Sequence, residues 1–382
     1  NRLENISSWN WVSDPTLNQI RSMQMPNGHD LHTMPIADLR SWIIEHNRQQ
    51  SEIFCDPDTK GLRMQYRAMH PTELMAMKCM DGRLNLPLIA GIPLGVAQPI
   101  RGLGGKFDLG WPYLGEVVTD WVRYSMGKGR DCIILVTYHW SRGDEHRGCR
   151  GFGYDLEEAR AYTVTFTAQA ERMFGKRHTT VYPIRVGVET DEDALVFHGV
   201  NGKILDLSTA NGYTETDLRA ALADLYPDMK FRMLEDLLPL TIGNIKHIAE
   251  VRRSNRPILE AEHRERIIGT GRGFDWLHIM NLAFLVGPFD PDLAKPIRTA
   301  AKLIADNLKS GRVPDDGIVL LTCAPYREEA GYDVPRATEK VIMLSRFALG
   351  VIEDEVPDLK GRVHMITGTV NQHTRKLDEV IS

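Results

Sequence analysis

Residues 74–83 read LMAMKCMDGR, an apolar run that passes into a short polar motif. The apolar run is typical of a buried β-strand, and it places Cys79 at the carboxyl end of that strand. Asp81 and Arg83 follow at alternate positions, where a carboxylate and a guanidinium can pair bidentately. Open α/β sheets carry their functional sites at the carboxyl ends of parallel strands. The sequence therefore predicts a chemically active turn directly after this strand.

A second apolar run, CIILVTY at residues 132–138, ends at His139, and Cys149 follows ten residues later. Two thiolates and an imidazole are good zinc ligands, and a set of three leaves the fourth tetrahedral position open for chemistry. Cys79, His139 and Cys149 therefore predict one catalytic zinc ion per chain. The competing interpretation is that the cysteines pack as small apolar residues. The agreement of ligand types, order and strand context favours zinc.

The histidine ligand has two candidates. His146 lies three residues before Cys149, the usual spacing for such a pair, whereas His139 directly follows a strand. Residues 141–145 have the character of an insertion between that strand and the second cysteine. A ligand fixed at a strand end is better positioned than one in a polar loop. We therefore choose His139, with His146 as the alternative.

The composition of the 382-residue chain, 42% hydrophobic and 25% charged, is that of a globular protein of two or three domains. A net charge of −5 gives no signal for nucleic acid or for an anionic membrane. No apolar run reaches the length of a transmembrane helix. The five cysteines are too few, and odd in number, for a disulfide framework, so we interpret three of them as packing residues: Cys55, Cys132 and Cys323.

The chain divides into three predicted domains. Residues 1–66 form a helical N-terminal domain, in which Pro35–Ile44 carries apolar residues at helical spacing. Residues 67–262 alternate strand and helix patterns, which indicates a parallel-sheet α/β domain that carries the metal motif. Residues 263–382 form a second domain of similar design.

This last domain reads as a degenerate copy of the domain before it. Its strand at residues 317–324 matches the strand that ends at His139 almost position for position, so that Ala324 replaces His139. The strand that ends at Gly287 is matched with the one that ends at Cys79. Neither replacement can bind a metal, and the copy is predicted to lack zinc.

Cys79, Asp81 and Arg83 stand at alternate positions and are followed by a strand that ends in His139 and then by Cys149. This arrangement resembles the β-class carbonic anhydrases. The long spacing from His139 to Cys149, the helical domain and the degenerate copy resemble the carboxysomal shell members of that class. Residues 187–194 (GVETDEDA) and 271–277 (GRGFDWL) are also similar to that family. The resemblance covers essentially the whole chain and implies a β-carbonic-anhydrase-like catalytic domain between the helical domain and the copy.

That resemblance implies zinc-dependent interconversion of CO₂ and bicarbonate by attack of zinc-bound hydroxide on CO₂. It further implies residence in a carboxysome, a bacterial microcompartment in the cytoplasm, with the shell or the carboxylase as partner and CO₂ supplied to that carboxylase. We expect a homodimer or a larger homo-oligomer, and no nucleic-acid or membrane partner. Family members often carry an N-terminal extension that engages encapsulated partners, and we expect this chain to lack it.

Asp81 and Arg83 are the candidate catalytic residues. A carboxylate that accepts a hydrogen bond from the reactive hydroxide would hold it in place, and a neighbouring cation keeps such a carboxylate ionised. The alternative is a solvated surface ion pair. In some β-class enzymes the aspartate instead moves onto zinc and closes the site. Proton transfer to solvent needs a shuttle, for which His146 is the first candidate.

Two competing functions share the zinc motif. One is a cytosolic β-class carbonic anhydrase or a relative that hydrolyses CS₂ or COS, and the other is a non-catalytic shell or scaffold protein with structural zinc. The glycine-rich stretches Arg101–Lys106 and Gly269–Gly273 could each receive an anion on backbone N–H groups, although flexible loops are the favoured interpretation. No Ser or Thr follows Lys106, which excludes a nucleotide-binding P-loop.

Overall fold

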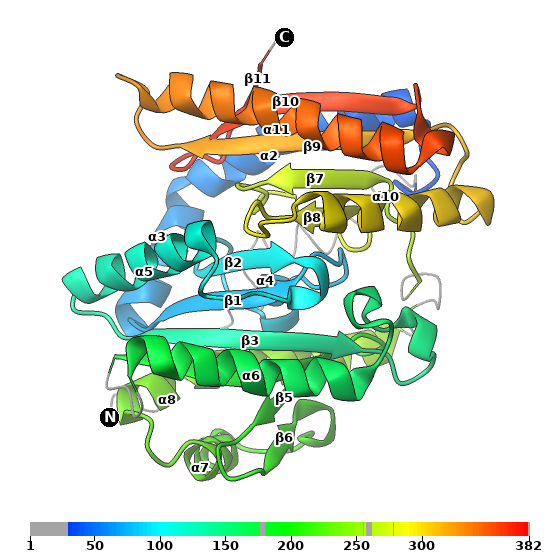
Figure 1. Ribbon diagram of the computed structural model, residues 1–382. Coiled ribbons are helices and arrows are strands. Elements are labelled where there is room, and N and C mark those ends of the chain that lie inside the picture. The colour runs from blue at the N-terminus through cyan, green and yellow to red at the C-terminus, as the bar shows by residue number, and fades with distance from the viewer. Residues whose placement is uncertain (1–29, 176–179, 255, 257–261, 278, 381–382) are drawn as a thin grey trace.

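The computed structural model describes residues 30–175, 180–254, 256, 262–277 and 279–380, which form two α/β units stacked one above the other (Figure 1). Each unit is built on a sheet of mainly parallel strands with helices packed on its faces. The predicted fold class, with an N-terminal helical region and two parallel-sheet units, is confirmed. No described helix combines the length and apolarity that crossing a bilayer requires.

The first sheet has six strands in the order β2-β1-β3-β4-β5-β6, of which the first four are parallel and the last two antiparallel. Side chains alternate between its faces, so that Met77 and Val136 join one apolar cluster while Ala76 and Leu135 join the other. The strands are β1 (Glu73–Cys79), β2 (Ala97–Gly102), β3 (Cys132–Trp140), β4 (Val181–Glu189), β5 (Ala194–His198) and β6 (Ile204–Asp206).

Helices cover both faces of this sheet. The cluster around Met77 is closed by α5 (Pro112–Gly127) and α6 (Leu156–Phe174). The opposite face is covered by three helices: α4 (Leu86–Ala90), α7 (Glu215–Leu225) and α8 (Phe231–Ser254). Short 3₁₀ turns connect these elements and those of the second unit: η4 (Leu103–Gly105), η5 (Glu145–Arg147), η6 (Arg150–Phe152), η7 (Leu207–Thr209) and η8 (Pro357–Leu359).

The second sheet repeats this order. Its strands run β8-β7-β9-β10-β11, with the first four parallel and β11 antiparallel. Strand β7 takes the place of β1, β8 that of β2 and β9 that of β3. The elements are β7 (Ile267–Gly271), β8 (Ala283–Val286), β9 (Ile318–Tyr326), β10 (Val363–Asn371), β11 (Leu377–Glu379), α10 (Ala294–Lys309) and α11 (Asp333–Glu355).

The strand order corrects one part of the predicted match between the two units. The strand that leads to Gly287 is the edge strand β8, so Gly287 is not the counterpart of Cys79. Gly271, at the end of β7, takes that place. Both strands are short apolar runs, and nothing in their composition shows which one pairs with β9. With Gly271 matched to Cys79, the strand registers of the two sheets still make Ala324 the counterpart of His139.

The N-terminal helices are α2 (Ile36–Cys55) and α3 (Pro57–Met69). The Asp56 carboxylate accepts from the N–H groups of residues 58 and 59 and so starts α3. Helix α2 packs on the second sheet, since Leu39 and Ile43 share an apolar cluster with Val319 and Ile366. The helical character predicted for this region is confirmed over its described part, while the domain boundaries at residues 66 and 262 stay predictions.

The two sheets meet edge to edge. The N–H of Leu285 in β8 donates to the carbonyl of Met80 (2.9 Å), and the N–H of Gly287 donates to the carbonyl of Arg101 (3.1 Å). Each sheet therefore covers the edge of the other, where unpaired backbone N–H and C=O groups would otherwise be exposed. The approach is close at Gly82, where a Cβ would lie 2.6 Å from the carbonyl oxygen of Ala283.

A methyl group at Gly82 tests this junction. We expect Gly82→Ala to lower the free energy of unfolding by about 1–3 kcal/mol, because the new Cβ forces the sheet edges apart. Gly127→Ala is the matched control, since a Cβ at Gly127 would meet nothing within 4 Å. Equilibrium denaturation of both variants measures the difference. Equal stability of the two variants would show that the junction is looser than described.

Candidate metal centre

Cys79 and His139 meet because β1 and β3 are neighbouring parallel strands that end at the same edge of the sheet. Cys149 reaches the same point from the loop after β3, and all three side chains are buried. Their ligand atoms lie within 4.8 Å of one another, and the two Sγ atoms are 3.9 Å apart. Two sulfurs bound to tetrahedral zinc at about 2.3 Å would be separated by about 3.8 Å. The donor set therefore fits zinc.

The imidazole of His139 fits the same role. The residue is 2% exposed, and neither ring nitrogen has a hydrogen-bond partner within the described residues. Its Nε2 lies 3.9 Å from Oδ2 of Asp81, which is too far for a hydrogen bond. Buried polar atoms without partners are costly and rare in folded proteins. A cation bound at a ring nitrogen would remove that cost.

The contact between the two sulfurs shifts the pKa values of the two thiols in opposite directions. Donation of the Cys149 S–H to Cys79 lowers the pKa of the Cys79 thiol well below its ordinary value. The same contact, together with burial, raises the pKa of the Cys149 thiol. A metal ion between the sulfurs would displace that proton, because the thiolate is the form that binds metals.

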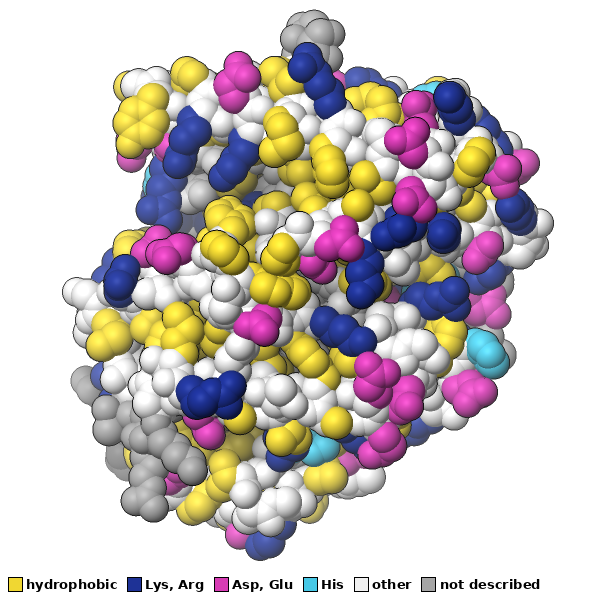
Figure 2. Space-filling model, viewed as in Figure 1, with side chains coloured by type: hydrophobic (Ala, Val, Ile, Leu, Met, Phe, Trp, Pro, Cys, Tyr) yellow, Lys and Arg dark blue, Asp and Glu magenta, His cyan; other side chains and the backbone are white. Residues whose placement is uncertain are grey.

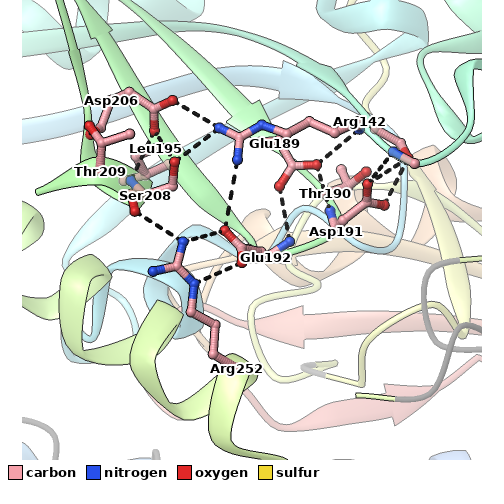
Figure 3. A network of polar contacts seen from close by, with 12 residues as sticks. Arg142, Glu189, Thr190, Asp191, Glu192, Leu195, Asp206, Ser208, Thr209 and Arg252 are labelled. Atoms are coloured by element: carbon pink, nitrogen blue, oxygen red, sulfur yellow. Dashed lines mark hydrogen bonds and ion pairs between the residues drawn. The ribbon is translucent and has the colours of Figure 1, made fainter. Parts of the chain in front are cut away.

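A polar network joins the loop that carries Cys149 to the antiparallel edge of the first sheet (Figure 3). The backbone N–H of Arg142 donates to the Glu189 carboxylate (3.1 Å), and the Arg142 guanidinium donates to Asp206 (2.8 Å). Glu189 is fully buried at the end of β4, and this burial raises the pKa of its carboxyl. The first part of the loop is thus tied to two strands.

Further contacts hold the same loop. The hydroxyl of Ser141 and the N–H of Gly143 both donate to Asp191, each at 2.7 Å. On the other side of the network, Arg252 of α8 donates to Glu192 at 2.7 Å (Figure 3). The insertion between strand and second cysteine is therefore anchored, which allows a ligand ten residues beyond the histidine to be held in place.

His146 lies outside the ligand group. Its side chain is 74% exposed, its Nδ1 is 3.4 Å from the Asp144 carboxylate, and its ring lies 5.6 Å from that of Tyr154. The structure thus groups His139 with the two cysteines, as chosen from the sequence. The role of these three residues as zinc ligands stays a prediction.

Asp81 and Arg83 form a buried ion pair beside the ligand group. The Arg83 guanidinium donates to both carboxylate oxygens, at 3.0 Å from Nε and 2.7 Å from Nη2, and its backbone N–H adds a bond of 2.9 Å. The residues are 3% and 1% exposed, so the alternative of a solvated surface pair is wrong. Burial alone would raise the pKa of Asp81, but the Arg83 charge outweighs it and holds that pKa well below its usual range.

Two site residues come from the second half of the chain and were missed in the sequence. His263 Nε2 lies 3.4 Å from Nη2 of Arg83 and 4.0 Å from Oδ2 of Asp81. Its Nδ1 is 3.1 Å from both carboxylate oxygens of Glu265, which is fully buried. In the sequence, His263 and Glu265 at alternate positions just before a strand are only a weak indication of a functional site. Its meaning depends on how the two units pack, which the sequence alone does not reveal.

The chain is similar to curated proteins named carboxysome shell carbonic anhydrase. It is 28% identical over 238 residues to that of Prochlorococcus marinus (strain MIT 9313), and 26% identical over 249 residues to that of Hydrogenovibrio crunogenus. These matches cover 54% of this chain and 46% and 45% of the two relatives, so the chain spans about half the length of the curated relatives it matches. No protein-family model matches. The resemblance inferred from the motifs is confirmed.

Metal analysis of single variants tests the ligand group. We expect Cys79→Ser, His139→Ala and Cys149→Ser each to lose most of the bound zinc, because each removes one of three protein ligands. His146→Ala is the control and should retain one zinc per chain, since its side chain points into solvent. Retention of zinc by His139→Ala with loss in His146→Ala would reverse the ligand assignment.

Proposed function

We propose that this chain is a zinc-dependent carbonic anhydrase that interconverts CO₂ and bicarbonate. The observation that carries the proposal is the buried group of Cys79, His139 and Cys149 next to the buried pair of Asp81 and Arg83. The likeness to carboxysome shell carbonic anhydrases supports the same reaction. Stopped-flow CO₂ hydration with zinc quantified in the same sample tests it directly, and absence of turnover by the zinc-loaded protein would refute it.

Zinc held by these three side chains would supply a Lewis acid that makes water nucleophilic near neutral pH. The thiolates of Cys79 and Cys149 would balance the charge of the ion, while His139 would bind as a neutral imidazole. His139 sits at a strand end and Cys149 in an anchored loop, so the chain holds the donor atoms in place before an ion binds.

Asp81 would orient the attacking oxygen. Its Oδ2 is the carboxylate oxygen that faces His139, so an acceptor stands beside the ligand group. Arg83 keeps this carboxylate ionised and, by bonding both oxygens, fixes the plane of the carboxyl group. Movement of Asp81 onto a metal would have to break that bidentate contact, so the arrangement favours the open form.

His263 would act as a positioning residue for Arg83. With its Nδ1–H donated to Glu265, the imidazole presents Nε2 as an acceptor toward the Arg83 guanidinium, and this tautomer follows from the hydrogen-bond network. Because His263 and Glu265 precede β7, the second half of the chain would complete the site. The copy is then needed for catalysis although it carries no equivalent of the ligand group at the ends of β7 and β9.

The relatives are named for the carboxysome shell, and we extend that location to this chain. There the enzyme would convert bicarbonate to CO₂ for the carboxylase and would assemble as a homodimer or larger homo-oligomer. Localisation of a fluorescently tagged full chain in carboxysome-forming cells tests this part, and a uniformly cytosolic signal would speak for a free β-class enzyme instead.

Replacing Asp81 separates metal binding from catalysis. We expect Asp81→Asn to keep its zinc but to lose at least about 100-fold in kcat/KM, because a preorganised anionic acceptor is removed from the reaction. Asp144→Asn, in the exposed loop, is the charge-matched control and should behave like the parent protein. Unchanged turnover of the zinc-loaded Asp81→Asn enzyme would contradict the proposed role.

Replacing His263 tests the contribution of the second half. We expect His263→Gln to retain zinc and to lower kcat about tenfold with little change in KM for CO₂, because Arg83 loses its outer partner and orientation is weakened. His373→Gln, which removes an exposed histidine that has no assigned role, serves as the control. A full kcat in His263→Gln, or a loss of zinc that explains the loss of rate, would count against the positioning role.

A further inference from the structure

Arg256 lies two residues beyond the end of α8, on the stretch of chain that leads from the first unit to the second, and its side chain is only 9% exposed. Its guanidinium binds the turn between β4 and β5, residues 190–193. Nη1 donates to Oδ2 of Asp193 at 2.7 Å, and Nη2 donates to the carbonyls of Thr190 at 2.7 Å and of Asp191 at 2.6 Å. One side chain therefore binds the β4–β5 turn at three points.

This burial sets Arg256 apart from arginines that pair on the surface. Figure 2 shows basic and acidic side chains interspersed over one face of the molecule, and the pair of Arg160 with Glu157, whose side chains are 40% and 78% exposed, is an example of a surface pair. Solvent screens such pairs, so they contribute little to stability. A buried guanidinium that binds a buried carboxylate is different, because removal of one partner leaves a buried charge without its counter-ion. The contact of Arg256 therefore holds two segments of chain firmly together.

The β4–β5 turn needs such support. Asp193 has a φ of +57°, a left-handed conformation that residues other than glycine adopt rarely and only where surrounding contacts enforce it. Its side chain is 1% exposed, and Oδ2 lies 2.9 Å from Nε2 of His247 in α8. Burial raises the pKa of Asp193, but the hydrogen bond with His247 and the charge of Arg256 outweigh burial and keep that pKa below its ordinary value. Arg256 therefore stabilises both the charge and the shape of the turn.

The β4–β5 turn also contacts the segments that carry two of the predicted metal ligands. The N–H of Thr190 donates to the carbonyl of Trp140 at 2.8 Å, and Trp140 directly follows His139. The Asp191 carboxylate accepts from two groups at the start of the loop that leads to Cys149 (Figure 3). The two carbonyls bound by the guanidinium belong to these same two residues of the turn. The contact therefore acts directly on the part of the turn that meets the ligand segments.

The last part of the same loop is held by the same carboxylate. Arg147 stands two residues before Cys149, and its Nη1 lies 3.5 Å from Oδ1 of Asp191. Both ends of the loop thus rest on Asp191, whose backbone carbonyl is one of the atoms that Arg256 binds. A shift of this one residue would move Cys149 relative to the strand that ends at His139.

We propose that Arg256 is a positioning residue for the metal centre. By fixing the β4–β5 turn, it holds Cys149 at the distance from His139 that a shared metal ion requires. Arg256 also stands seven residues before His263 in the sequence, so the chain that joins the two units passes from the support of Cys149 to the proposed partner of Arg83. The inference rests on the proposed zinc site, which it extends to a residue outside the ligand group.

Release of zinc to the chelating dye 4-(2-pyridylazo)resorcinol, at a temperature below the Tm of every variant, tests this role. We expect Arg256→Gln to release zinc about tenfold faster than the parent, because loss of an outer support weakens a metal site by about that factor. Arg256→Lys restores a charge beside Asp193 but lacks the fork that spans a carboxylate and two carbonyls. We expect the lysine variant to recover most of the Tm lost in the glutamine variant and to release zinc about as fast as that variant does.

Cobalt(II) in place of zinc gives a second readout, because its absorption bands report how thiolates and imidazole are arranged around the ion. We expect these bands to shift in both Arg256 variants. Arg253→Gln is the matched control, since it removes an exposed arginine from the last turn of α8. It should show the cobalt bands and the zinc release of the parent.

Parental zinc release and cobalt bands in Arg256→Gln would overturn the positioning role, and so would a lower Tm as the only change, because Arg256 would then only stabilise the fold. The lysine variant decides if the glutamine variant does not fold. Parental zinc release by Arg256→Lys would show that charge balance alone is at work and would also overturn the role. A parent protein that binds no zinc would refute the proposed metal centre itself and, with it, this inference.

Discussion

The edge-to-edge contact between the two sheets, marked by the bond from the Leu285 N–H of β8 to the carbonyl of Met80 directly after β1, is the constraint on which the other features depend. It lies one residue beyond Cys79, so it fixes the turn that carries Asp81 and Arg83. It also covers that ion pair and brings His263 within reach of the guanidinium. A buried ion pair is stable only when its remaining donors are satisfied. The second half of the chain provides that partner.

Local patterns in the sequence were enough to predict that Cys79, His139 and Cys149 come together and that the fold is repeated. Cys79 and His139 each follow a mainly apolar run, and parallel strands bring such residues to one edge of a sheet whatever the remaining fold is. The exposed His146 could be set aside because a polar loop positions a ligand poorly. In these cases the relevant physics acts over a few residues, and the printed sequence contains it.

Features that depend on the packing of distant segments could not be predicted. The runs at β7 and β8 are both short and apolar, so composition does not show which one lies beside β9, and Gly287 was matched wrongly in place of Gly271. His263 and Glu265 gain meaning only once the second unit meets the first. One cavity is lined by cationic side chains from five separate segments of the sequence, and only the folded chain brings them together: Lys78, Arg101, Arg272, Arg327 and Arg375.

Joining two copies of one fold in a single chain has a consequence for symmetry. In a dimer of identical subunits every substitution appears twice, so a change that suits one site is imposed on the other. Here Gly271 stands in the place of Cys79, and a Cβ at Gly271 would lie 2.0 Å from the Cys323 carbonyl, so the second site no longer has room for any side chain there. Covalent linkage thus allows the strand ends of the two units to differ, with Cys79 and His139 in the first unit and Gly271 and Ala324 in the second.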